Sequence, residues 1–205
     1  MTPVPDISAV VLAGGKSRRL GMDKSLLRVN GQWLLEQILG SLSALSDDLI
    51  LVGTGRRQFA RLPARVVPDD FPGGGPLAGI YSGVKAMRHT RGLFLACDMP
   101  FLNLHLLRYM ILLSPDFDVV IPSIEGQTEP LHAIYSKACA DPMRASLERK
   151  DQRVVTFFPQ VRVRYVSPSE IDLLDPEHLS FFNINTAEDL ARAERLLSSD
   201  GKHSS

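Results

Sequence analysis

Cysteine is scarce in this sequence, and so are long apolar runs. Only two cysteines, Cys97 and Cys139, occur among 205 residues. They lie far apart and show no paired CxxC spacing, so neither a disulfide framework nor a zinc site is expected. No apolar run reaches the roughly 18 residues of a membrane-spanning helix, and residues 1–6 lack the pattern of a secretory signal. These absences predict a cytoplasmic protein without a membrane partner.

An excess of charge of either sign is also missing. The chain has 23 basic and 23 acidic residues and a formal net charge of zero. Nucleic-acid-binding proteins usually carry a basic face or stripe, so no nucleic-acid partner is expected. The 44% hydrophobic content is ample for a core. We expect one domain over residues 1–197, a polar and disordered tail at 198–205, and disorder in the first few residues.

Apolar strand-like runs alternate with helical patterns along the chain. Short continuous apolar runs indicate strands buried in a largely parallel sheet. The alternation predicts an α/β fold of three layers, Rossmann-like, with a mostly parallel central sheet and a ligand at the strand ends beside a topological switch point. Thr186 and Asp189 form a predicted capping box before the last helix. The expected strands are 8–12, 49–52, 65–67, 93–97, 118–121 and 131–135, and the expected helices are 33–45, 79–87, 104–113, 137–148 and 187–197.

Residues 10–24 carry a dense patch of positive charge directly after an apolar strand. Gly14 and Gly15 let the backbone turn and bring its amides against phosphate oxygens, while the cations supply charge-assisted donors. This pattern predicts a loop that binds a triphosphate. The cations are Lys16, Arg18, Arg19 and Lys24.

Two familiar phosphate-binding loops do not match this segment. A Walker A loop needs a glycine five positions before the Gly-Lys pair, and Gly15-Lys16 has none there. A dinucleotide fingerprint needs GxGxxG running directly into a helix, whereas the helix here begins only near Gln32. The loop is therefore expected to wrap its ligand along its length.

A second candidate site begins where the strand at 93–97 ends in Asp98 and is turned by Pro100. If this strand and the first are parallel neighbours, Asp98 lies at the same sheet edge as the glycine loop. A carboxylate there is placed to hold Mg²⁺ together with phosphate oxygens and water. The alternative is a turn aspartate that caps the segment after it.

Two further polar pairs are candidates for ligand contacts. Asp69 and Asp70, in a loop rich in proline and glycine, are candidates to accept hydrogen bonds from a purine's N1–H and exocyclic amine or from ribose hydroxyls, or they are simply solvated. Asn183 and Asn185 precede the last helix, where the common role of asparagine is a turn or pre-cap. Because the two asparagines alternate, one of them is expected to face the site.

Several of these motifs together resemble a known family. They are Leu12-Ala13-Gly14-Gly15, Arg18-Arg19-Leu20-Gly21, Asp23-Lys24, Gly75-Pro76-Leu77-Ala78-Gly79, Cys97-Asp98-Met99-Pro100 and Asn183-Ile184-Asn185-Thr186. In order and spacing they resemble the molybdenum cofactor guanylyltransferases, within the nucleotidyltransferase superfamily and its GT-A-type sheet. The segment Gly53-Thr54-Gly55 departs from the family's pattern, since an asparagine is often found there, after the second strand.

The resemblance implies a role for each matching residue. Catalysis falls to Arg19, Lys24 and Asp98, and Asp98 also holds the Mg²⁺ cofactor. GTP contacts fall to Leu12, Ala13, Gly14, Gly15, Lys24, Asp69 and Asp98. The acceptor side takes Arg153, Asn183 and Asn185, with His132 as a further candidate contact for the pterin phosphate; a lone histidine beside a strand is more often structural.

The implied reaction transfers GMP from GTP to molybdopterin and releases pyrophosphate. The nucleophile is already an ionised phosphate oxygen, so positioning and charge neutralisation suffice and no catalytic histidine is needed. The other partners implied are molybdenum cofactor biosynthesis proteins and apo-molybdoenzymes, in transient contact. Two alternatives stay open: a CTP-dependent cytidylyltransferase acting on molybdopterin or another phosphate acceptor, and an adaptor that binds nucleotide or cofactor without turnover. The Leu-Ala-Gly-Gly and Asp23-Lys24 variants favour guanine.

Overall fold

The computed structural model describes residues 6–13, 23–53, 59 and 61–200, apart from the side chains of 199 and 200. In this part of the chain the main sheet has the strand order β10-β7-β9-β6-β1-β4-β5, with β8 beside β7, and β2 pairs with β3 in a separate hairpin. The strands are β1 (Ser8–Leu12), β2 (Arg28–Val29), β3 (Gln32–Trp33), β4 (Asp48–Val52), β5 (Arg65–Val67), β6 (Arg91–Ala96), β7 (Val119–Ile124), β8 (Gln127–Thr128), β9 (His132–Ser136) and β10 (Val163–Val166).

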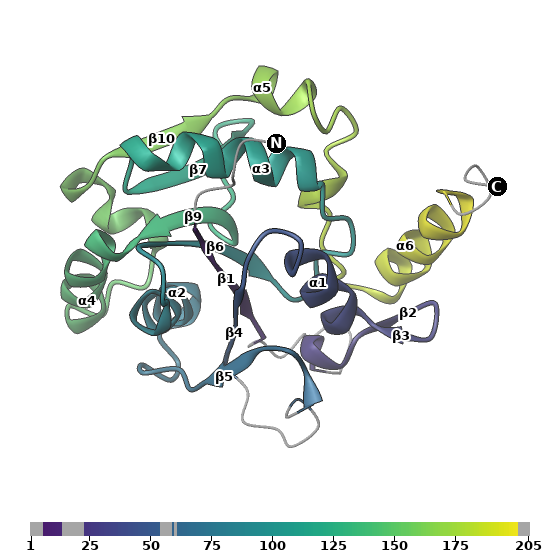
Figure 1. Ribbon diagram of the computed structural model, residues 1–205, viewed down its shortest axis with the longest axis horizontal. Helices are drawn as coiled ribbons and strands as arrows, with labels where there is room; N and C mark the ends of the chain where they lie inside the picture. Colours follow the sequence, from purple (N-terminus) through teal and green to yellow (C-terminus); the bar gives the residue numbers. More distant parts are fainter. Residues whose placement is uncertain (1–5, 14–22, 54–58, 60, 201–205) are drawn as a thin grey trace.

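Helices connect most of these strands and cover both faces of the sheet (Figure 1). The α-helices are α1 (Leu34–Leu42), α2 (Gly75–Ala86), α3 (Leu104–Leu113), α4 (Ala140–Glu148), α5 (Pro168–Asp172) and α6 (Ala187–Asp200). Shorter 3-10 helices are η1 (Lys24–Leu26), η3 (Ser114–Asp116), η4 (Lys137–Cys139), η5 (Val154–Gln160) and η6 (Leu179–Phe181).

The mostly parallel sheet expected from the sequence is confirmed. Strand β1 pairs in parallel with β4 and β6, β4 with β5, and β7 with β10. The exceptions are β9, which runs antiparallel to both β6 and β7, and the short β8, which runs antiparallel to β7. Only a short connection containing β8 separates β7 from β9, and a parallel pairing would need a much longer crossover.

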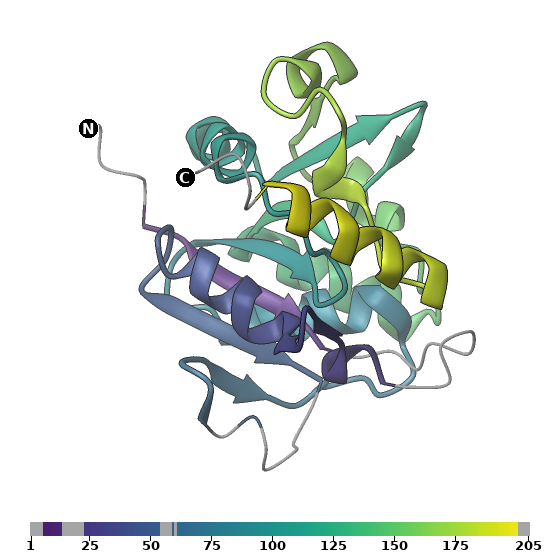
Figure 2. The same ribbon diagram turned by 90° about the vertical axis from the view of Figure 1, so that its right-hand side faces the viewer.

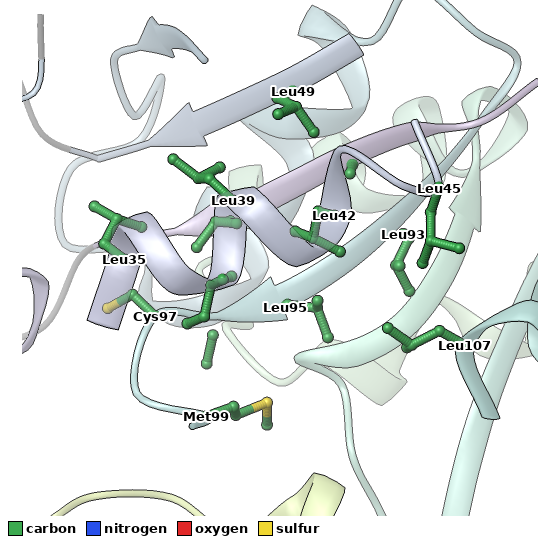
Figure 3. Close-up of a cluster of buried hydrophobic side chains, with 14 of the residues drawn as sticks. Leu35, Leu39, Leu42, Leu45, Leu49, Leu93, Leu95, Cys97, Met99 and Leu107 are labelled. Carbon is green, nitrogen blue, oxygen red and sulfur yellow. The ribbon is translucent and has the colours of Figure 1, made fainter. Parts of the chain in front are cut away.

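The sheet separates two apolar cores. Along β1, Ala9 and Val11 pack into the core beneath α1 and α3, while Val10 and Leu12 pack into the core beneath α2 and α4. Figures 1 and 2 show α1 and α2 on opposite sides of the central strands. Figure 3 shows leucines of α1 and β6 in one buried cluster, among them Leu35, Leu42 and Leu93. Both sides of the central strands are therefore buried, as their continuous apolar runs predict.

Helix α2 approaches the sheet unusually closely, and two glycines make this possible. A Cβ on Gly79 would lie 2.6 Å from Leu12 Cδ2, and a Cβ on Gly83 would lie 2.6 Å from Phe94 Cε1 and 2.8 Å from Val10 Cγ1. The helix backbone thus rests directly on the side chains of β1 and β6. This contact sets the position of the whole segment from Gly75 to Ala86.

The last helix confirms one prediction and corrects another. Thr186 Oγ1 accepts the amide of Asp189 at 3.1 Å, and Asp189 Oδ2 accepts the amide of Thr186 at 2.9 Å, which is the predicted capping box. The helix continues to Asp200, so residues 198–200 are helical and not part of a disordered tail; residues 201–205 lie outside the described residues. In the described part of the chain, no helix has the length and apolar character to cross a membrane.

Replacing Gly83 by alanine tests the close approach of α2. The added methyl meets Phe94 and Val10 in a packed core, so we expect the free energy of unfolding to fall by about 1–3 kcal/mol. Gly40 in α1 is the matched control, because a Cβ added there would meet open space, with no contact within 4 Å. Gly40→Ala should stabilise the protein by up to ~1 kcal/mol. Urea denaturation of both variants measures this; equal effects would contradict the proposed contact.

Candidate active site

The carboxyl ends of three neighbouring strands meet at one edge of the sheet. The amide of Cys97, after β6, donates to the carbonyl of Leu12 at 3.3 Å, and the amide of Ala13 donates to the carbonyl of Val52 at 2.9 Å. Strand β1 lies between β4 and β6: the chain runs from β1 to β4 and β5 on one side, and then crosses through α2 to β6 on the other side. This is a topological switch point, where α/β proteins bind ligands.

Lys24, Asp98 and Asn185 converge at this edge. Lys24 Nζ donates to the carboxylate of Asp98 and, at 2.6 Å, to Oδ1 of Asn185. The Asp98 side chain is only 7% exposed and that of Lys24 20%. Lys24 begins η1, which Asp23 caps by accepting the amide of Ser25 at 3.0 Å. Three segments distant in sequence thus place a cation between two oxygen atoms.

The cap of α3 is Asn103 and not Asp98. Asn103 Oδ1 accepts the amides of His105 at 3.0 Å and Leu106 at 3.1 Å, and so caps the helix. Asp98 stands five residues earlier, and its own carbonyl accepts the amide of Ile184 at 3.0 Å. Its carboxylate therefore belongs to the polar cluster with Lys24.

The structure distinguishes Asn185 from Asn183. Asn185 contacts Lys24, whereas Asn183 Nδ2 donates to the nearby carbonyl of Phe181 at 3.2 Å. Asp189 accepts the backbone amide of Asn185 at 3.0 Å, and this hydrogen bond is the main reason why the pKa of Asp189 is lowered. The start of α6 thus holds Asn185 in place.

A hollow of about 420 Å³ lies beside the polar cluster. Its volume falls within the range of small-molecule sites in proteins. Among the described residues that line it, Asp69 is the one that carries a charge. The lining residues are Leu12, Val52, Gly53, Asp69, Gly73, Gly75, Pro76, Gly79 and Leu131.

Asp69, and not Asp70, faces this hollow. Asp70 is exposed and forms an ion pair with Lys85 at 2.6 Å. Asp69 is half-buried, and its Oδ1 accepts the amide of Phe71 at 3.0 Å and lies 3.3 Å from Ser82 Oγ. The contribution of Leu131 was not foreseen from the sequence, since it depends on the antiparallel direction of β9.

His132 is not at an open surface. Its side chain is fully buried, packs against Phe181 with ring centroids 4.9 Å apart, and neither ring nitrogen has a hydrogen-bond partner in the described structure. Burial lowers its pKa to about 4, with a small opposing effect of Asp175. This position corrects the expectation that His132 contacts the acceptor: it belongs to the core beneath α3.

Arg153 lies at the surface, next to the loop that precedes α2. Its side chain is 79% exposed and pairs with Asp151, with Nη2 to Oδ2 at 3.0 Å. The neighbouring Gln152 donates from Nε2 to the carbonyl of Gly73 at 3.0 Å, which ties this segment to the rim of the hollow. The structure therefore brings Arg153 near the hollow's loop without a contact to Lys24 or Asp98.

Both cysteines are buried and free. Burial raises the pKa of the Cys97 thiol well above its usual range, and raises that of Cys139 to about 12. Both thiols are therefore protonated at neutral pH, and neither is suited to act as a nucleophile. The other loop predictions, for Gly14, Gly15 and Arg19, lie outside the described residues, as do the cations Lys16 and Arg18.

The chemistry of the cluster suits the Mg²⁺ ion that the sequence predicts. Mg²⁺ binds oxygen ligands and usually takes only one or two carboxylates besides phosphate oxygens and water. Asp98 and Asn185 present two such oxygens that already share one cation, Lys24 Nζ. Within the described ranges, no group of three or more acidic, histidine or cysteine side chains forms a cage for a metal. The residues present fit an ion held jointly with a nucleotide.

A doubly wound sheet with a polar cluster at its switch point is an arrangement that binds small ligands. Residues 9–163 match the family described as MobA-like NTP transferase domain. This match spans most of the chain, and the chain belongs to that family. It is a nucleotidyltransferase, as the sequence predicts.

Relatives and solved structures agree with this assignment. The chain is 39% identical to the probable molybdenum cofactor guanylyltransferase of Pelotomaculum thermopropionicum, over 91% of each chain. It is 36% identical to the molybdenum cofactor guanylyltransferase of Syntrophotalea carbinolica, over 92% of this chain and 90% of the relative. The crystal structure of molybdopterin-guanine dinucleotide biosynthesis protein A from Archaeoglobus fulgidus aligns with a TM-score of 0.81 at 28% identity, over 94% of this chain and all of the other.

His132 makes stability depend on pH. The unfolded chain binds a proton at this residue near pH 6.5, but the folded chain only near pH 4. As the pH falls from about 6.5 toward 4, the unfolded state gains a proton that the folded state lacks, so stability falls. Between pH 7 and pH 5 wild type should lose about 2 kcal/mol more than His132→Leu. Urea denaturation at the two pH values measures the difference; parallel losses would contradict the buried neutral histidine.

Asn185 and Asn183 provide a matched pair for the polar cluster. Asn185→Ala removes an oxygen that holds Lys24, so we expect turnover to fall on the order of tenfold, as for the loss of a hydrogen bond to a charged group. Asn183→Ala removes a local bond to Phe181 and should have the smaller effect. Steady-state rates of both variants, at equal thermal stability, make the comparison. Equal rates of the two variants would show that the contact of Asn185 with Lys24 does not contribute to turnover.

Proposed function

We propose that this enzyme transfers GMP from GTP to the terminal phosphate of molybdopterin and releases pyrophosphate. The observation that carries the proposal is the cation of Lys24 held between Asp98 and Asn185, beside a hollow large enough for a nucleoside. The names of the relatives, molybdenum cofactor guanylyltransferases, support the choice of substrates.

In this proposal the nucleoside lies in the hollow and the phosphates lie over the cluster. Leu12, Val52 and Pro76 provide apolar walls for the nucleoside, and the Asp69 carboxylate accepts a hydrogen bond from it. Lys24 leaves Asp98 to bind a phosphate oxygen, because an ammonium group neutralises the triphosphate's charge. Asp98, with Asn185 nearby, is the residue that holds Mg²⁺, which neutralises negative charge on the phosphate oxygens when bound.

The chemical step needs little from the protein beyond position and charge. A phosphate oxygen of the acceptor forms a bond to the α-phosphorus, and the bond from that phosphorus to the bridging oxygen of the leaving pyrophosphate breaks. The attacking oxygen is already ionised, so no side chain must take its proton. The buried, protonated state of Cys97 and the position of His132 in the core agree with this, since neither is available as a base or nucleophile. Lys24 stabilises the charge that develops on the phosphates.

The acceptor is proposed to approach from the side of residues 151–153. Arg153 is exposed there, and its neighbour Gln152 donates to the carbonyl of Gly73, which lines the hollow. An anionic acceptor phosphate would take the place of the Asp151 carboxylate on the guanidinium, which suits bidentate binding of phosphate. Arg19 is proposed to complete the phosphate contacts, as the resemblance implies. Transient contacts with cofactor biosynthesis proteins and apo-molybdoenzymes remain part of the proposal.

The test is release of pyrophosphate with each of the four nucleoside triphosphates, with molybdopterin and Mg²⁺. We expect release with GTP alone among them, and only when molybdopterin is present. Release with CTP instead would identify the cytidylyltransferase alternative. Nucleotide binding without release would identify the adaptor.

Asp98→Asn is the decisive variant in this assay. It keeps the side chain's volume but removes the negative charge that attracts a divalent cation, so we expect pyrophosphate release to fall at least about a hundredfold, a typical loss for an electrostatic catalytic group. Asp70→Asn is the matched control, because this carboxylate lies in the adjacent loop and pairs only with exposed Lys85 in the described structure. It should keep near wild-type rates. Full activity of Asp98→Asn would exclude Asp98 from the mechanism.

A further inference from the structure

Ser82 lies at the centre of a small hydrogen-bond network beneath the hollow. It is on α2, its residue is only 4% exposed, and its Oγ accepts the backbone amide of Asp70 at 2.9 Å. The same oxygen lies 2.9 Å from the carbonyl of Ala78 and 3.3 Å from Oδ1 of Asp69. One hydroxyl therefore contacts its own helix and both aspartates of the loop.

The hydroxyl has one proton for two acceptors. A serine oxygen donates one hydrogen bond and accepts others, so the Ala78 carbonyl and the Asp69 carboxylate compete for that proton. The shorter distance belongs to the carbonyl one turn back, while the charge of the carboxylate favours the longer bond. The bond accepted from the Asp70 amide is present in either case, and it fixes the backbone directly after Asp69.

The two oxygens of Asp69 differ as a result. Oδ1 accepts the amide of Phe71 at 3.0 Å and faces Ser82. Within the described ranges Oδ2 has no hydrogen-bond partner, and Asp69 lines the hollow. The network thus holds Oδ1 of Asp69 in place and leaves Oδ2 to accept a hydrogen bond from a ligand.

We propose that Ser82 is a positioning residue for nucleoside recognition, which acts by holding Asp69 so that its second oxygen accepts a hydrogen bond from the bound nucleoside. This inference rests on the proposed function, because it assumes that the hollow receives the nucleoside. The group that donates to Asp69 is an N–H of the base or an O–H of the ribose. Ser82 itself does not touch the nucleotide.

Ser146 provides a control for the general cost of losing a buried hydroxyl. It is fully buried in α4, and its Oγ donates to the carbonyl of Pro142 at 3.1 Å, one turn back, as Ser82 does to Ala78. Ser146 does not line the hollow. A merely structural role of Ser82 would make Ser82→Ala and Ser146→Ala alike: each would lose stability and keep its affinity for nucleotide.

The experiment is a double-mutant cycle in equilibrium binding of GTP, measured by calorimetry with Mg²⁺ on wild type, Ser82→Ala, Asp69→Asn and the double variant. We expect Ser82→Ala to weaken binding about fivefold, the equivalent of one typical hydrogen bond. The double variant should bind no more weakly than Asp69→Asn alone, because Ser82 acts through Asp69. The value of kcat should stay near wild type, so that the effect appears in KM.

Two analogues test two of the candidate donors. ITP lacks the exocyclic amine of guanine, and 2′-deoxy-GTP lacks the ribose 2′-hydroxyl. If one of these groups is the donor, binding of the analogue that lacks it should be insensitive to Ser82→Ala, and binding of the other should still weaken about fivefold. Weakening of both analogues would assign the donor to N1–H or to the 3′-hydroxyl. Wild-type affinity of Ser82→Ala for GTP, or additive losses in the double variant, would overturn the inference while the proposed function stands. Failure of wild type to bind any nucleoside triphosphate would instead overturn the proposed function and this inference with it.

Discussion

The site depends on one interaction, the ammonium group of Lys24 between the oxygens of Asp98 and Asn185. These contacts span 74 and 161 positions of sequence, so they form only when η1, the end of β6 and the start of α6 are all in place. The Asp98 carboxylate is almost fully buried, and a buried carboxylate without a partner is strongly destabilising. The cation that pairs with Asp98 is also one that would neutralise a triphosphate.

Strand β1 connects this cluster to the hollow. Its last residue, Leu12, accepts the amide of Cys97 next to Asp98 and also lines the hollow with Asp69. Charged and apolar compartments therefore lie on either side of a single strand end. A ligand with a charged and an aromatic half, such as a nucleotide, suits this division.

Local signals in the sequence were sufficient for the strands β1, β4, β5 and β6, the capping box of α6 and the placement of Asp98 at a strand end. They were insufficient where tertiary contacts decide. The direction of β9 places His132 opposite Leu95, on the core side of the sheet, and a lone histidine in the sequence carries no sign of which face it takes. Likewise, the sequence does not distinguish Asn183 from Asn185, and only the contact of Asn185 with Lys24 does. Strand β10 was missed because its polar residues interrupt the apolar pattern at the edge of the sheet.

Helix α2 explains why the position of Asp69 and the packing of the core are coupled. Gly79 rests on Leu12 and Gly83 on Phe94, while Ser82, on the turn between them, contacts the loop that carries Asp69. Alanine at either glycine would favour the helix by up to about 1 kcal/mol in isolation, but it would push the helix away from the sheet. Ser82 would move with it, and the carboxylate would lose its support. The glycines therefore serve the geometry of the site as much as the packing of the core.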